Sequence, residues 1–60
     1  MVQVKIFDYE HEKDLEEEVN RFLTKIDEGQ LIDIKFDVEA QVEGNGEQIY
    51  CFSAMIIYRK

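Results

Sequence analysis

The chain has little of several residue types on which common classes of protein depend. It contains no proline, no tryptophan, one cysteine, one histidine and three glycines in 60 residues. A lone cysteine, Cys51, cannot form an internal disulfide, which favours a reducing compartment. No apolar run approaches the roughly 20 residues of a membrane-spanning helix, and the N-terminus lacks the apolar core of a signal peptide. The sequence therefore predicts a cytoplasmic protein with no membrane segment.

Basic residues are also scarce. Seven Lys and Arg residues stand against fourteen Asp and Glu residues, so the formal net charge is −7. Modules that bind nucleic acids carry a basic face that replaces phosphate counterions, so this charge argues against a nucleic-acid partner. The hydrophobic fraction of 45% is nevertheless too high for a disordered acidic tail. We expect one small domain, residues 1–60, whose core is marginal unless the protein oligomerises.

Hydrophobic periodicity predicts three strands and one helix. Apolar and polar side chains alternate in residues 2–9 and 31–42, and residues 48–60 are apolar on both faces. Both patterns are typical of strands. Residues 11–27 instead carry an apolar stripe with helical spacing. Asp8 is the expected N-cap of this helix, and Gly29 is the expected left-handed residue after its end. The stripe consists of Leu15, Val19, Phe22, Leu23 and Ile26.

The order β-α-β-β predicts an α+β fold. A right-handed crossover makes the first two strands parallel, and a hairpin makes the third antiparallel to the second. The third strand is apolar on both faces, which is typical of a central strand. We therefore expect a fully antiparallel three-stranded sheet in the order 1-3-2, with the helix covering one face.

The dipeptide Asn45-Gly46 predicts a two-residue type I′ turn with positive φ at both residues. This register pairs Val42 with Ile49 and turns Cys51 and Met55 toward the helix. A change of one residue in the loop would exchange the two faces of the third strand. In either case a single helix covers one face, so an apolar row on the third strand stays uncovered.

With the two-residue turn, the uncovered row is rich in aromatic side chains. Such a contiguous patch is rarely exposed by small monomers, so we expect it to be an interface. The predicted partner is a second copy of the chain, with a dimer favoured, and another protein is a further candidate. The predicted interface residues are Phe7, Tyr50, Phe52, Ile56 and Tyr58.

No residue pattern predicts catalysis, a metal or a cofactor. His11-Glu12 resembles the start of a zinc-protease helix, but Leu15 stands where the second histidine is needed. Cys51 and His11 lack any motif that would activate the thiol, and a mid-strand cysteine usually packs as a small hydrophobe. The acidic run 16–18 is typical of a solvated helix face and offers no calcium-loop geometry. We expect a non-enzymatic protein.

Segments along nearly the whole chain carry a family resemblance. They are Val4–Asp8, Glu10–Leu15 with the following Glu16, Asn20–Leu23, Ile32–Lys35 and Ser53–Tyr58. Together they resemble a small family of Firmicute proteins of the sporulation-specific Cse type, whose function is unknown. The resemblance implies a bacterial cytoplasmic protein made during sporulation, and it supplies no active-site residues.

A looser similarity concerns topology alone. The β-α-β-β order at this length is similar to that of dodecins, small flavin-storing proteins that form hollow oligomers, although fold does not imply function. Dodecins typically stack flavin against a tryptophan, which this chain lacks. Two functions therefore remain open. The favoured one is a small oligomeric or protein-interaction protein, and the alternative is a binder of a planar, flavin-like ligand stacked by Tyr50, Phe52 and Tyr58.

Overall fold

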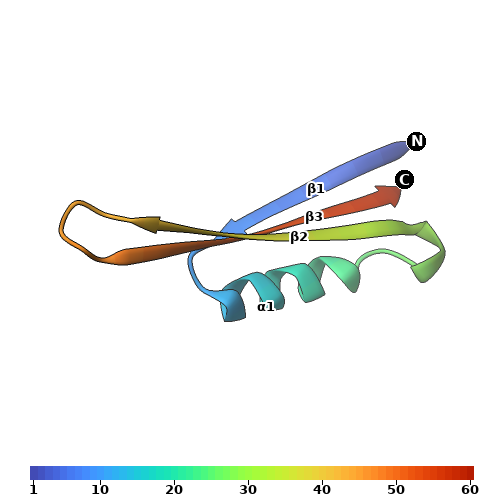
Figure 1. The fold of residues 1–60 in the computed structure, drawn as a ribbon. Coiled ribbons are helices and arrows are strands. Elements are labelled where there is room, and N and C mark those ends of the chain that lie inside the picture. Colours follow the sequence, from blue (N-terminus) through green and yellow to red (C-terminus); the bar gives the residue numbers. More distant parts are fainter.

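The computed structural model describes all 60 residues and shows one three-stranded sheet with a single α-helix against it (Figure 1). Both outer strands pair antiparallel with β3, and the sheet order is β1-β3-β2. The predicted α+β fold, with its central third strand, is therefore confirmed. The elements are β1 (Val2–Tyr9), α1 (Glu12–Leu23), a 3-10 helix η1 (Glu28–Gln30), β2 (Leu31–Val42) and β3 (Gln48–Arg59).

The α-helix is shorter than the predicted 11–27. It begins after His11, whose side chain makes no capping bond, and ends at Leu23. The N–H group of Lys25 donates to the carbonyl of Phe22 at 2.9 Å, three residues back. Such a bond tightens the last turn and ends the α-helical pattern. Ile26 is therefore the one residue of the predicted apolar stripe that lies outside the helix, and its side chain is half-buried.

Two predicted helix-end residues have other roles. Asp8 is not the N-cap, because its carboxylate accepts a hydrogen bond from the hydroxyl of Ser53 across the β1–β3 pair. Gly29 lies inside η1 and does not have a positive φ, because α1 ends well before it. The turn around η1 is held instead by the side chain of Gln30, whose Oε1 accepts from the N–H of Asp27 at 2.7 Å.

Beyond the ends of β2 and β3, the N–H group of Glu43 donates to the carbonyl of Glu47 at 2.7 Å, so the hairpin closes on a loop of three residues, 44–46, rather than two. Val42 pairs with Gln48 instead of the next residue along. The N–H group of Gly46 donates to the carbonyl of Glu43 at 2.9 Å, which closes a four-residue turn. Gly46 has φ of 87°, whereas no non-glycine residue has a positive φ. This is the three-residue hairpin in which a left-handed glycine follows a type I turn, so the predicted type I′ turn is wrong.

The one-residue shift in register exchanges the two faces of β3. Ala54 and Ile56 face α1, whereas Cys51 and Met55 face away from it, the reverse of what the two-residue turn predicts. The placement of the predicted interface residues on the uncovered face is therefore wrong. Phe7 and Ile56 are buried under the helix. Phe52 and Tyr58 are half-buried and pack against the core, and Tyr50 is exposed.

The core forms where α1 crosses β1 and β3. Only four side chains are buried, namely Phe7, Leu15, Ala54 and Ile56. Phe22 of α1 packs edge-to-face on Phe7, with ring centroids 6.0 Å apart, and on Tyr58, at 5.1 Å. The helix packs against β1 and β3 rather than β2. Every residue of β2 is therefore exposed.

Replacing Gly46 with valine is expected to lower the free energy of unfolding by about 1–2 kcal/mol, because a β-branched side chain is strained at a positive φ. The matched control is Gly44→Val in the same loop, since Gly44 has no positive φ and nothing within 4 Å of its added Cβ. Thermal melts at equal protein concentration measure both. Equal losses in the two variants would contradict the left-handed assignment of Gly46.

Candidate interaction surfaces

The molecule is elongated and has an unusually large surface. Its extents are 46 × 18 × 11 Å and its radius of gyration is 13.9 Å, against roughly 10 Å for a compact domain of this length. Its accessible surface is 4847 Å², whereas a monomeric protein of 7.2 kDa exposes roughly 4100 Å². The excess of roughly 700 Å² is close to the roughly 800 Å² that each partner buries in a standard interface.

One uncovered surface lies on the side of the sheet opposite α1. We call it the helix-free face, and it is defined by Val2, Val4, Ile6, Met55 and Ile57. The three β1 side chains are between 53 and 58% exposed. Strand pairing places Val4 opposite Ile57, and Ile6 opposite Met55, so the five residues are contiguous. The face is apolar over β1 and β3 and charged over β2.

The outer edge of β2 is partly closed to further strands. The carboxylate of Asp33 accepts a hydrogen bond from the backbone N–H of Ile34 at 2.8 Å, and Asp37 does the same for Val38 at 3.0 Å. A backbone N–H that is already bonded to the preceding side chain is not free to pair with another strand. These two bonds favour association through the faces of the sheet over association through this edge.

A second uncovered surface is the end of the β2–β3 hairpin. The last residue pair of β1 is Tyr9 with Phe52. Residues 39–51, which we call the arm, extend beyond that pair and past the start of α1 (Figure 1). Val42 is 70% exposed and Tyr50 is 44% exposed. An isolated two-stranded hairpin is at best marginally stable in water, so the arm has few contacts of its own to order it.

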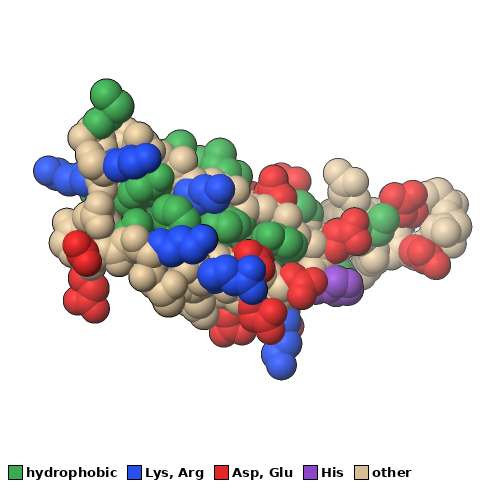
Figure 2. All heavy atoms as spheres, turned by 180° about the vertical axis from the view of Figure 1, so that it is seen from behind, with side chains coloured by type: hydrophobic (Ala, Val, Ile, Leu, Met, Phe, Trp, Pro, Cys, Tyr) green, Lys and Arg blue, Asp and Glu red, His purple; other side chains and the backbone are tan.

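The arm carries charge of one sign. Its charged residues are Glu39, Glu43 and Glu47, and no Lys or Arg occurs anywhere in residues 36–58. Figure 2 shows acidic side chains on the narrow end of the molecule, and basic side chains gathered on the wider body. The signal for this segregation was present in the sequence, as a 23-residue stretch without a base.

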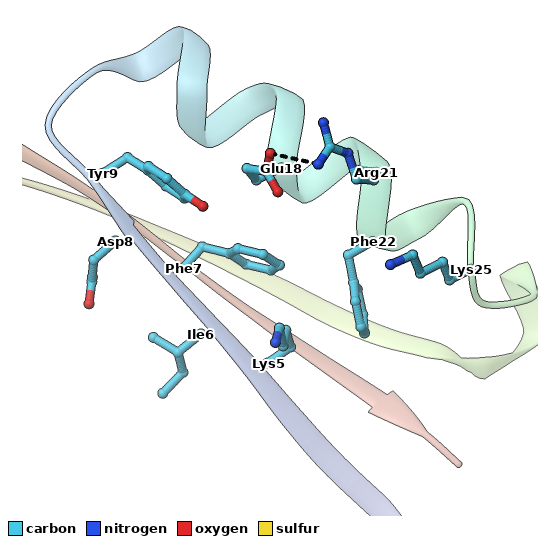
Figure 3. Close-up of a pocket in the computed structure, with 9 residues that line it drawn as sticks. All are labelled: Lys5, Ile6, Phe7, Asp8, Tyr9, Glu18, Arg21, Phe22 and Lys25. Carbon is cyan, nitrogen blue, oxygen red and sulfur yellow. Dashed lines mark ion pairs between the residues drawn. The ribbon is translucent and has the colours of Figure 1, made fainter.

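A groove of about 700 Å³ runs between β1 and α1 (Figure 3). Phe7 and Phe22 provide its aromatic walls. Its lining carries three cations and two carboxylates, namely Lys5, Arg21, Lys25, Asp8 and Glu18. We call this hollow the basic groove. It brings together three of the seven bases of an acidic chain, one from a strand and two from the helix and the turn after it.

The cations of the basic groove are only partly neutralised. Arg21 Nη1 lies 3.2 Å from Glu18 Oε1, and this exposed pair is the one ion pair in the structure. Lys5 Nζ lies 5.7 Å from the centroid of the Phe7 ring, an attractive cation–π geometry. Lys5 and Lys25 form no ion pair, and the groove as a whole has a small excess of positive charge, with three cations against two carboxylates.

The residues that the sequence offered for catalysis or ligand binding do not form a common site. His11 is exposed at the start of α1, whereas Cys51 is half-buried on the far side of the sheet, with its Sγ 4.0 Å from the Ser53 hydroxyl. No three His, Cys, Asp or Glu side chains come close enough to hold a metal ion. Tyr50 and Phe52 stack on each other at 6.3 Å. The third aromatic of the proposed ligand stack packs on α1 instead, so the three do not surround a common space.

The one α-helix of the protein does not have the length and apolar character needed to cross a membrane.

Comparison with known proteins identifies the family but gives no structural relative. The family described as Sporulation protein Cse60 matches residues 1–60. A Bacillus subtilis (strain 168) protein named sporulation protein cse60 is 60% identical over 60 residues, which cover all of both chains. No solved structure matches. With the match spanning the whole chain, the protein belongs to the Cse60 family of sporulation proteins.

Proposed function

We propose that the protein is a non-enzymatic, cytoplasmic homo-oligomer, most simply a dimer, that acts in sporulation through protein–protein contacts. The observation that supports this proposal best is the mismatch between core and surface. Four of 60 residues are buried, while the accessible surface exceeds that of a typical monomer by about the area that one partner buries in a standard interface. The separation of His11 from Cys51 supports the non-enzymatic part.

The helix-free face is the proposed contact between copies. Its apolar half would pack against the same half of a second copy related by a two-fold axis, because a two-fold contact uses one surface twice. The charged half on β2 contains both signs, with Lys35 between Asp33 and Asp37. In the two-fold arrangement the lysine of one copy can meet a carboxylate of the other and fix their relative orientation.

Light scattering coupled to size exclusion tests the proposal at tens of micromolar protein. The wild type is expected to have a mass of at least twice the 7.2-kDa chain. Val4→Asp is expected to reduce that mass toward the monomer, because it places a carboxylate in the centre of the helix-free face. Val4→Ile is the matched control, since it keeps the position apolar and β-branched, and it should leave the mass unchanged.

A monomeric wild type would overturn the proposal. A Val4→Asp protein that keeps the full wild-type mass would show that the helix-free face is not a contact between copies. The ligand-binding alternative has a separate readout, because a bound flavin would give protein purified from cells a visible absorption band.

A further inference from the structure

We infer that the acidic arm of one copy docks into the basic groove of another copy. The inference rests on the proposed self-association but uses different surfaces from the helix-free face. The arm and the groove are the two surfaces whose features remain unexplained within a single chain. They complement each other in both charge and apolar character.

Charge complementarity is the first reason. The arm presents carboxylates without a basic neighbour. The groove carries three cations against two carboxylates, and its Lys5 and Lys25 form no ion pair within the chain. Self-repulsion within a chain of net charge −7 disfavours association in general. Contact at the one cationic groove removes that repulsion locally and gives the two copies a preferred orientation.

Apolar complementarity is the second reason. On the side of the arm that continues the helix-facing surface of the sheet, Val42 and Tyr50 are exposed. The groove offers the rings of Phe7 and Phe22 between its cations (Figure 3). Tyrosine supplies a large apolar area with a polar tip, which suits a groove that is aromatic inside and charged at its rim. Docking would also order the otherwise unsupported hairpin.

The arm cannot fill the groove of its own chain. The groove lies along β1 beside α1, whereas the arm continues β2 and β3 away from both elements (Figure 1). Bending it back would break the β2–β3 ladder, which is continuous from Asp33 to the loop. The occupant that matches the groove is therefore the arm of a second copy.

Charge reversal with rescue tests this contact. The groove variant is Lys5→Glu/Lys25→Glu, and the arm variant is Glu43→Lys/Glu47→Lys. Each variant alone brings like charges together, so its association, measured by sedimentation equilibrium, is expected to weaken by roughly tenfold for a few exposed pairs. An equimolar mixture restores opposite charges at every arm–groove contact and is expected to regain wild-type association.

The matched controls change the same charges elsewhere on the chain. Lys13→Glu/Lys60→Glu lies outside the basic groove, and Glu16→Lys/Glu17→Lys lies on α1 outside the arm, so each control changes the net charge by four, as the test variants do. Neither is expected to alter association, and mixing the two should have no effect. Far-UV circular dichroism checks that every variant retains its helix.

The outcomes separate this inference from the proposed function. If the wild type is oligomeric and the two reversal variants associate as tightly as it does, the arm does not occupy the groove, although self-association stands. If the variants weaken association but the mixture does not rescue it, the residues act separately and the docking is wrong. If the wild type is monomeric, both proposals fail.

Salt provides a second measurement that needs no variant. Raising the ionic strength from about 0.05 M to about 0.5 M screens exposed charge pairs. Wild-type association is expected to weaken severalfold over this range, and that of the groove variant is expected to strengthen as its repulsion is screened. Insensitivity of the wild type to salt would contradict the docking. A groove that serves a small anion instead would bind inorganic phosphate with the wild-type mass unchanged, which would also overturn it.

Discussion

Replacing Ile56 with alanine is expected to lower the free energy of unfolding by about 2–5 kcal/mol, the usual cost of removing a large buried aliphatic side chain. Ile56 is the one fully buried side chain, with no exposed surface, at the centre of the helix-facing side of β3. A chain of 60 residues has a total stability of roughly 3–9 kcal/mol. At the middle of both ranges this truncation removes more than half of the stability and leaves roughly 2.5 kcal/mol, so we expect a variant that still folds but unfolds at a clearly lower urea concentration.

Urea denaturation followed by far-UV circular dichroism measures the effect at fixed protein concentration, because association also contributes to apparent stability. The control is Val38→Ala, which removes two methyl groups from a side chain that is 43% exposed and lies outside the arm, the basic groove and the helix-free face. Surface truncations of this kind stay within about 0.5 kcal/mol of the wild type. Similar losses at the two positions would show that the core does not lie where α1 crosses the sheet.

The sequence predicts the arrangement of the strands and the helix correctly, but it does not predict the register of the β2–β3 hairpin. Apolar periodicity places the strands and the helix, and the doubly apolar β3 identifies the central strand. Those same two apolar faces leave the register of β3 undetermined by pattern, so it depends on the loop alone. Asn45-Gly46 favours a two-residue loop, but the bond from Gly46 to the carbonyl of Glu43 closes a turn one position earlier.

The difference of one residue in loop length decides which side chains of β3 face away from the helix and are available to another protein. With the observed register Phe52 and Tyr58 of β3 pack against the core beside the helix, and the opposite side carries Met55 and Ile57. The offset of α1 toward β1 is likewise invisible in a pattern, because the stripe on a helix shows what is buried and not which strand buries it. The charge segregation, by contrast, can be read from the sequence directly.

Replacing Phe22 with alanine is expected to separate α1 from the sheet and to lower the free energy of unfolding by about 2–3 kcal/mol, less than for a fully buried phenylalanine because the Phe22 ring is half-buried. The ring of Phe22 contacts two strands, the outer strand β1 through Phe7 and the central strand β3 through Tyr58. The helix has 12 residues, and helices shorter than about 12–15 residues are marginal in water without tertiary packing. Loss of this contact is therefore expected to reduce the helical signal as well as the midpoint of unfolding.

Phe36 supplies a matched comparison, because it is the same residue type on the same side of the sheet but is 63% exposed on β2. Phe36→Ala should keep the helical signal and change the stability of the dissociated chain by no more than about 0.5 kcal/mol. Measuring both variants across a range of protein concentrations separates the two roles that a phenylalanine can have here. A loss that persists on dilution belongs to the fold of one chain, as expected for Phe22, whereas a loss that vanishes on dilution belongs to contacts between copies. Equal, concentration-independent losses in the two variants would mean that α1 covers β2 as well as β1 and β3, and that β2 offers no surface to a partner.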